Sequence, residues 1–87
     1  MDVQHYLELK KRYLVPCVYH FYKQPPLLVR GEGAYLFDEK GRKYLDCMSG
    51  VSVMNAGHGN EEILTAAIAQ LKTLQHTTTI YITAPML

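Results

Sequence analysis

The sequence predicts an α+β fold: an N-terminal helix, a three-stranded antiparallel meander and one further amphipathic helix. Apolar residues recur at helical spacing within residues 2–14 and again within residues 60–76. Between residues 27 and 47 they instead follow the period of two that is typical of half-buried strands. We therefore expect two segments. Residues 1–26 would form the first helix and an extended connector, and residues 27–87 would form the meander, a loop and the second helix.

The first helix is predicted to begin after Asp2, whose carboxylate can accept a hydrogen bond from a free amide group of the first turn. Its last turn carries the basic run of residues 10–12, where positive charge is favourable. Residues 15–26 contain three prolines, which exclude a continuous helix and favour an extended connector. The apolar side of the helix would consist of Tyr6, Leu7, Leu9, Tyr13 and Leu14.

The meander is predicted from short segments in which β-branched and aromatic residues are frequent, separated by glycine-containing turns. Gly31-Glu32-Gly33 is expected to form the first turn, because glycine tolerates the backbone conformations that tight reversals need. The strands are expected at residues 27–30, 34–37 and 42–47.

The second turn of the meander fixes its register. Asp38-Glu39-Lys40-Gly41 suits a type I turn with the glycine in the left-handed position of a bulge. With that turn, Leu36 faces Tyr44 and Tyr35 faces Leu45 across the two strands.

Residues 49–59 show no period and contain three glycines, so we expect an ordered loop there. The helix that follows would begin at the N-cap Asn60 and end near His76. Two glutamates occupy its first turn, where negative charge is favourable. Its apolar stripe would consist of Ile63, Leu64, Ala67, Ile68, Leu71 and Leu74.

The C-terminal residues predict the start of another helix. Thr83 is an N-cap candidate, and Pro85 lies in the first turn, where proline is favoured. The sequence ends at Leu87, so we expect it to belong to a longer chain.

Composition excludes several classes of protein. With 87 residues, 48% of them hydrophobic, and a net charge of +1, the chain is neither disordered nor a typical nucleic-acid binder. One domain with a small core is expected from this length. Cys17 and Cys47 fit free thiols in a reducing compartment. There is no run of about 18 apolar residues and no secretory signal, so we expect a cytoplasmic protein.

No catalytic set can be identified from the residues alone. The histidines and cysteines lack the spacing of metal ligands, and no lysine lies in an apolar pattern that would lower its pKa. Gly31-Glu32-Gly33 lacks the third glycine of a dinucleotide fingerprint. The 7 tyrosines fit either a surface covered by a partner or the half-buried positions of a thin domain.

The order of motifs nevertheless resembles the N-terminal segment of class III aminotransferases, which are fold type I enzymes that depend on pyridoxal phosphate. Where the family commonly has histidine-proline, this chain has Asn60-Glu61, and Asn60 can still cap the helix. The motifs that carry the resemblance are residues 29–38, Gly41 to Asp46, Ser49-Gly50, Asn55 to His58, and Gln70 with residues 74–77.

The resemblance implies an incomplete small-domain segment. It implies that Ser49, Gly50, Val51 and Tyr81 contribute to substrate binding, with the stretch around Tyr81 near a subunit interface. No catalytic, cofactor-binding or metal-binding residue is implied within this chain. In the family, the cofactor lysine, the acid that faces the pyridine nitrogen and the phosphate-binding loop all lie further along the sequence.

Two functions remain open at this point. The first is the N-terminal fragment of a transaminase, inactive alone, whose partners are the remainder of the enzyme or a second subunit of a dimer. The intact enzyme would transfer an amino group from an amino acid or amine to a keto acid, using pyridoxal 5'-phosphate. The alternative is a small interaction module that self-associates or docks on a longer chain. Neither function involves nucleic acid or a membrane.

Overall fold

The structure is a computed structural model that describes residues 2–17 and 21–86. Met1, residues 18–20 of the predicted connector, and Leu87 lie outside this description. Among the described residues, no helix is both long and apolar enough to span a bilayer. The elements, in chain order, are α1 (Val3–Tyr13), β1 (Leu28–Glu32), β2 (Tyr35–Asp38), β3 (Lys43–Leu45), α2 (Ser49–Ser52), α3 (Glu61–Thr73) and the 3-10 turn η1 (Ala84–Met86).

Both long helices begin at the predicted capping residues. Asp2 accepts a hydrogen bond from the His5 amide at 2.8 Å, and Asn60 accepts one from the Ile63 amide at 3.1 Å. A side-chain oxygen at this position satisfies an amide that has no partner within the helix. Helix α3 ends at Thr73, three residues earlier than the sequence predicts, because the next residue is extended.

The three strands form an antiparallel sheet in the order β1-β2-β3. The pairs Leu36–Tyr44 and Tyr35–Leu45 lie opposite one another between β2 and β3, which confirms the predicted register. Two cation–aromatic contacts cross the strands, with the Arg30 guanidinium 3.7 Å from the Phe37 ring centre and the Lys43 ammonium 3.8 Å from that of Tyr35. Charged side chains therefore cover aromatic rings of this sheet.

The predicted first turn is wrong in its position. Gly31 and Glu32 belong to β1 and pair with Leu36 and Tyr35, so the reversal takes place at Gly33, whose φ is +57°. Gly31 does not serve the turn. The absence of a side chain at Gly31 instead leaves room for His58, in the loop that precedes α3.

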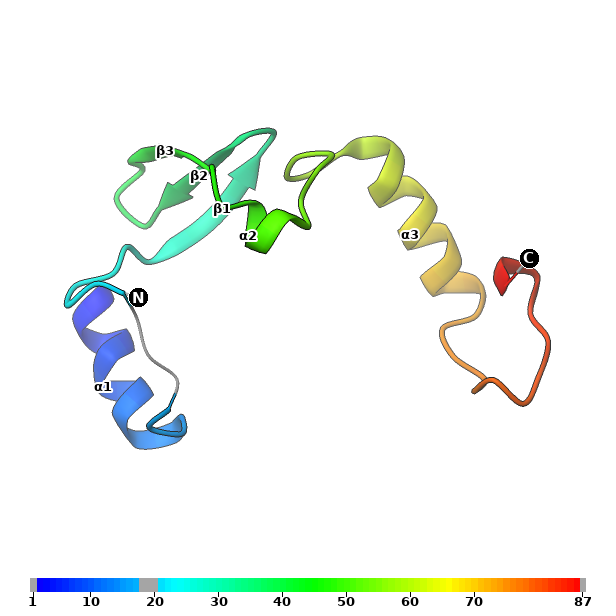
Figure 1. Ribbon diagram of the computed structural model, residues 1–87, viewed down its shortest axis with the longest axis horizontal. Coiled ribbons are helices and arrows are strands. Elements are labelled where there is room, and N and C mark those ends of the chain that lie inside the picture. Colours follow the sequence, from blue (N-terminus) through cyan, green and yellow to red (C-terminus); the bar gives the residue numbers. More distant parts are fainter. Residues whose placement is uncertain (1, 18–20, 87) are drawn as a thin grey trace.

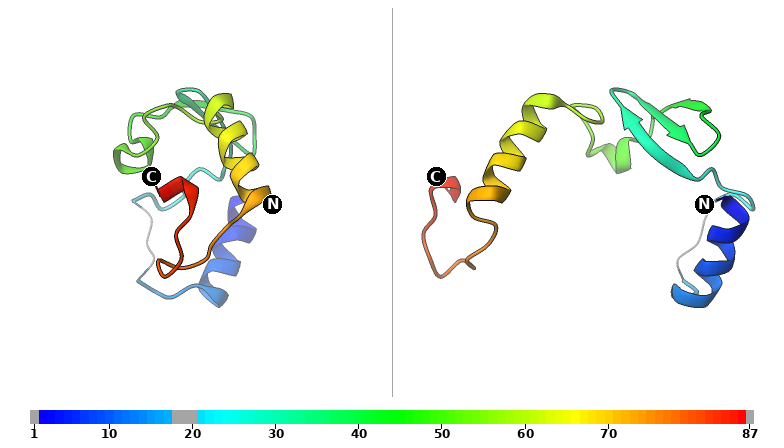
Figure 2. Two further views of the ribbon diagram at one scale, coloured as in Figure 1. Left: turned by 90° about the vertical axis from the view of Figure 1, so that its right-hand side faces the viewer. Right: turned by 180° about the vertical axis from the view of Figure 1, so that it is seen from behind.

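The described part of the chain forms an open arch (Figure 1). The sheet and α2 make its crown, α1 forms one leg, and α3 with the C-terminal segment forms the other; the view from behind shows the same arrangement (Figure 2). The Cα radius of gyration is 17.5 Å, whereas a compact domain of this length has about 12 Å. Among the described elements, close contacts join only β1 with β2 and β2 with β3.

The small core that the sequence predicts is absent from residues 2–17 and 21–86, where no hydrophobic residue is buried. The accessible surface is 7790 Å², compared with about 5,200 Å² for a compact protein of this mass. The reason for the wrong prediction is geometric. The amphipathic faces are formed as expected, but the arch brings no second face against them.

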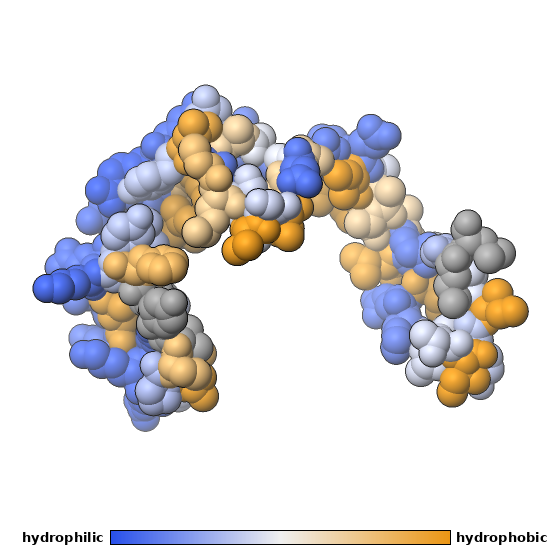
Figure 3. Space-filling view, viewed as in Figure 1, coloured by the Kyte–Doolittle hydropathy of each residue, from blue (hydrophilic) through white to orange (hydrophobic). Residues whose placement is uncertain are grey.

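The stripe on α3 is the clearest case. Ile63, Ile68 and Leu71 are 55%, 50% and 58% exposed, although their spacing places them on one side of the helix. Figure 3 shows that apolar side chains gather on the inner side of the arch beneath the crown, whereas the outer side over the sheet is largely hydrophilic.

Candidate functional site

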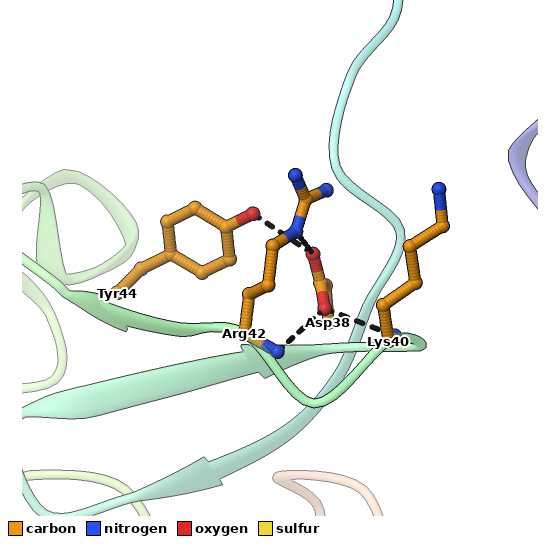
Figure 4. A network of polar contacts seen from close by, with 4 residues as sticks. All are labelled: Asp38, Lys40, Arg42 and Tyr44. Atoms are coloured by element: carbon orange, nitrogen blue, oxygen red, sulfur yellow. Dashed lines mark hydrogen bonds and ion pairs between the residues drawn. The ribbon is translucent and has the colours of Figure 1, made fainter.

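The β2–β3 hairpin is fixed by a buried carboxylate. Asp38 is 2% exposed and its two oxygens accept four hydrogen bonds, so its charge is fully satisfied (Figure 4). The amides of Lys40 and Arg42 donate at 3.0 and 2.9 Å, the Arg42 Nε at 2.6 Å and the Tyr44 hydroxyl at 2.8 Å. All four groups belong to residues 40–44, the turn and strand segment that the carboxylate itself helps to position.

Burial on its own would raise the pKa of Asp38. The hydrogen bonds from Tyr44, from the backbone and side chain of Arg42, and from the Lys40 backbone outweigh it and lower the pKa to about 2. The hairpin is therefore held by an ionised carboxylate throughout the physiological pH range, and it gives a rigid base to the loop that follows β3.

That loop begins with the unusual backbone of α2, where the sequence predicts irregular structure. Ser49, Gly50, Val51 and Ser52 have φ values of 51°, 60°, 66° and 62°, which together make one turn of left-handed helix. The amide of Ser52 donates to the Met48 carbonyl at 3.0 Å. A left-handed conformation is unfavourable for every residue here except the glycine, and most of all for the β-branched valine. This turn is the most strained described segment of the chain.

Asp46 ties the left-handed turn to the end of β3. Its Oδ1 accepts a hydrogen bond from the Ser49 amide at 2.8 Å, and its Oδ2 lies 2.7 Å from the His58 Nε2, whose N–H donates to it. Its backbone amide donates to the Ala34 carbonyl at 2.9 Å. The hydrogen bonds from His58 and the Ser49 amide lower the pKa of Asp46, so the carboxylate is ionised at neutral pH.

His58 is held against the sheet by glycines. Its amide and carbonyl each form a 2.8 Å hydrogen bond with Gly33, which makes a two-residue antiparallel bridge. A Cβ atom on Gly31 would lie 2.7 Å from the Cβ and Cγ of His58. A Cβ on Gly57, whose φ is +81°, would lie 3.1 Å from the Gly33 carbonyl oxygen. Glycine is therefore required on both sides for the histidine ring to reach Asp46.

The structure brings together three of the four predicted substrate-binding residues and leaves the fourth apart. Ser49, Gly50 and Val51 are successive residues of the left-handed turn, and the Val51 side chain is 78% exposed. Tyr81 is 66% exposed and belongs to the segment that follows α3; this segment lies at the end of the other leg (Figure 1). The described residues alone therefore do not form a closed pocket from this set.

Asp46 and His58 are the residues that sequence reasoning missed. The sequence did contain a sign of this contact. His58 stands between two glycines, and such small neighbours allow its ring to lie close to another backbone. Its partner lies 12 residues earlier in the chain, and no local period connects the two positions.

The described residues offer no obvious place for a metal or a covalent cofactor. No group of three or more histidine, cysteine or acidic side chains is gathered within residues 2–17 and 21–86. None of the lysines is buried, whereas a lysine that reacts with a carbonyl compound needs a desolvated or charge-perturbed setting.

Comparison with families of known proteins gives a match to the family described as aminotransferase class-III, over residues 20–87. The chain is 41% identical over 76 residues to alanine–glyoxylate aminotransferase 2 homolog 2 of Arabidopsis thaliana, covering 87% of this chain and 16% of that protein. It is 34% identical over 87 residues to acetylornithine aminotransferase of Methanocaldococcus jannaschii, covering 100% of this chain and 21% of that protein.

Solved structures give the same result for the fold. Ornithine delta-aminotransferase of Plasmodium falciparum superposes with a TM-score of 0.86 at 28% identity, covering 97% of this chain and 21% of that one. N-acetylornithine aminotransferase of Stenotrophomonas maltophilia superposes with a TM-score of 0.73 at 29% identity, covering 92% of this chain and 20% of that one. The chain thus spans about a fifth of the length of the relatives it matches.

Proposed function

This chain belongs to the class III aminotransferase family, and we propose that it forms the N-terminal part of the small domain of such an enzyme. The observation that carries the proposal is the open arch itself. Its elements match those of an intact ornithine aminotransferase over 97% of the chain, yet none of its described hydrophobic residues is buried. Hydrophobic burial is the main stabilising contribution to folding, so the arch needs a further body of protein on its inner side.

We infer that this further body is the remainder of an aminotransferase, in the same polypeptide or in a partner chain. The relatives are about five times as long as the matching segment, which leaves ample chain for a large domain. In the assembled enzyme, the apolar stripe of α3 and the segment around Tyr81 would be covered.

The proposed contribution of this chain to catalysis is the shape of the substrate pocket. The left-handed turn presents the exposed Val51 from a rigid base that consists of β3 and the Asp46 carboxylate. A fixed apolar side chain of this kind can orient the amino-acid substrate and exclude water, both of which speed reactions of bound substrates. Tyr81 would join this pocket from the other leg of the arch.

The residues of this chain do not fit the role of cofactor anchor. The family uses pyridoxal phosphate, which supplies the electron sink for amino transfer. None of the lysines described here is buried, and the carboxylates of Asp38 and Asp46 are fully engaged within the fold. The cofactor-binding lysine, acid and phosphate loop are therefore expected in the remainder of the enzyme.

A chimera tests this proposal. Residues 1–87 would replace the matching segment of the Methanocaldococcus jannaschii enzyme, to which they align along their whole length. We expect a folded enzyme that binds pyridoxal phosphate and transfers an amino group from an amino donor to a keto acid. A chimera that folds and binds the cofactor but has no transaminase activity with a panel of amino donors would contradict the proposed function. The M. jannaschii enzyme without substitution serves as the positive control.

A further inference from the structure

We propose that Asp46 and His58 are positioning residues that hold the left-handed turn, and with it the Val51 side chain, in the conformation that meets the substrate. The inference rests on the proposed function for its substrate and on the observed contacts for its mechanism. Neither residue is expected to touch the substrate.

The left-handed turn needs an external restraint. Four successive residues have φ between 51° and 66°, and three of them carry side chains that disfavour this region. A short left-handed turn is not a conformation that such a sequence holds by itself, because the ordinary right-handed region is open to Ser49, Val51 and Ser52.

Asp46 supplies this restraint at the first residue of the turn. Its Oδ1 accepts the Ser49 amide at 2.8 Å, and the Ser49 carbonyl in turn accepts the amides of Val53 and Met54 at 2.8 and 2.9 Å. Hydrogen bonds thus fix both the amide group and the carbonyl group of Ser49. A change at the Asp46 carboxylate would release the entire turn.

His58 in turn fixes the carboxylate of Asp46. The 2.7 Å contact between Nε2 and Oδ2 occupies the carboxylate oxygen that Ser49 does not use. The side chains of His58 and Asp46 are only 20% and 9% exposed, so water does not readily substitute for either partner. The histidine itself is held in place by its bridge to Gly33 and by the space that Gly31 leaves.

The arrangement is not a catalytic triad, although it contains a serine, a histidine and an aspartate. The Ser49 hydroxyl lies 3.5 Å from the Asp46 carbonyl, and the histidine N–H points at the carboxylate. A nucleophile would instead need its hydroxyl on the histidine. The geometry supports a restraint on the backbone, which is why the proposal assigns positioning and not chemistry to the pair.

The experiment uses the chimeric enzyme with two independent perturbations of the pair. H58A removes the donor, and H58Q restores an amide donor near the position of Nε2. G31A keeps every polar group but places a methyl group 2.7 Å from the histidine Cβ. G41A is a control for backbone strain that arises away from the pair, because a Cβ at Gly41, whose φ is +77°, meets nothing within 4 Å and makes no contact with His58.

Amide hydrogen exchange of residues 48–54, followed by mass spectrometry, reports the turn whether or not the enzyme is active. H58A and G31A are expected to raise the exchange rate there by about tenfold, the effect of losing one hydrogen bond to a charged group. H58Q and G41A are expected to leave it close to the parent value. Replacing Ser52 by glycine, which adopts a positive φ without strain, should restore protection in the H58A background.

Steady-state kinetics then tests the role in positioning. H58A should raise KM for the amino donor by about tenfold with a smaller change in kcat, whereas a loss of folded protein alone would lower kcat and leave KM unchanged. Unchanged exchange in H58A and G31A would overturn the proposal, as would increased exchange with an unchanged KM. An inactive parent chimera would contradict the proposed function, while exchange would still decide whether the pair holds the turn.

Discussion

The Arg42 guanidinium lies against the buried carboxylate of Asp38, with Nε 2.6 Å from Oδ2, yet the arginine side chain is 61% exposed and the aspartate side chain is fully buried. The ion pair is therefore open to solvent from one side only. The exposed guanidinium contributes little to the stability of the hairpin, because solvent screens its charge. The backbone amides and the Tyr44 hydroxyl are the groups that hold Asp38 in place.

We predict that substitutions around Asp38 rank in a definite order. D38N should destabilise the hairpin most, because it replaces a carboxylate that accepts four hydrogen bonds by an amide that cannot accept them all. Y44F should have an intermediate effect and R42Q the smallest. Thermal unfolding of the chimera measures the order. A larger loss for R42Q than for D38N would show that the ion pair dominates.

The pH dependence of stability follows from the same carboxylate. Its pKa in the folded chain, about 2, lies below its ordinary value of 3.8, so the unfolded state binds more protons between these values. The stabilisation from Asp38 should be complete above about pH 4 and should disappear as the pH falls through about 2.

Acid titration of the unfolding midpoint checks this prediction. D38N should reduce the acid-induced loss of stability, while the smaller part that comes from the lowered pKa of Asp46 should remain. An identical acid profile in D38N and in the parent would contradict the prediction.

The N-cap of α3 gives a prediction that is independent of the sheet. N60A removes the acceptor for the Ile63 amide and should lower the free energy of unfolding by about 1 kcal/mol. N60D retains the acceptor and should be nearly neutral. Equal losses for the two variants would indicate that the side chain acts through another contact.

The apolar stripe of α3 should contribute to stability only where other protein covers it. Leu71 is 58% exposed in this chain, so L71A should not reduce helicity of the isolated chain, because alanine favours helix. In the chimera the same substitution should cost about 2–5 kcal/mol, as for a leucine in a core. Lys72 is the control, since K72A removes a neighbouring side chain from the polar side. If L71A left the free energy of unfolding of the chimera unchanged, the stripe would not be covered there.

The isolated chain should have no transaminase activity. With pyridoxal phosphate, an amino donor and 2-oxoglutarate, we expect no glutamate above the rate without protein, since no lysine is placed to hold the cofactor. Glutamate formation that depends on a lysine of this chain would contradict the proposed division of roles.

The sequence predicted the elements whose causes are local. The turn chemistry of Asp38 to Gly41 sets the register that pairs Leu36 with Tyr44, and the side chain of Asn60 caps the first turn of α3. In both cases a few neighbouring residues decide the outcome, so a pattern can be recognised without knowledge of the rest of the fold.

The features that could not be predicted depend on distant residues. Gly31 lies in a strand, where it pairs with Leu36, and it leaves room for the ring of His58, 27 positions later. The left-handed turn at residues 49–52 is bonded to Asp46 through the Ser49 amide, and the apolar faces expected to form a core are exposed among the described residues. Single-residue patterns indicate which faces are apolar but not what covers them.

Scanning calorimetry of the isolated chain, in a sample shown by sedimentation to be monomeric, tests the central claim most directly. If the arch takes its core from the remainder of an aminotransferase, the monomer should show no cooperative heat-absorption peak, whereas the chimera should show one. A sharp, reversible transition of the isolated monomer would mean that these 87 residues form a core of their own and would contradict the account.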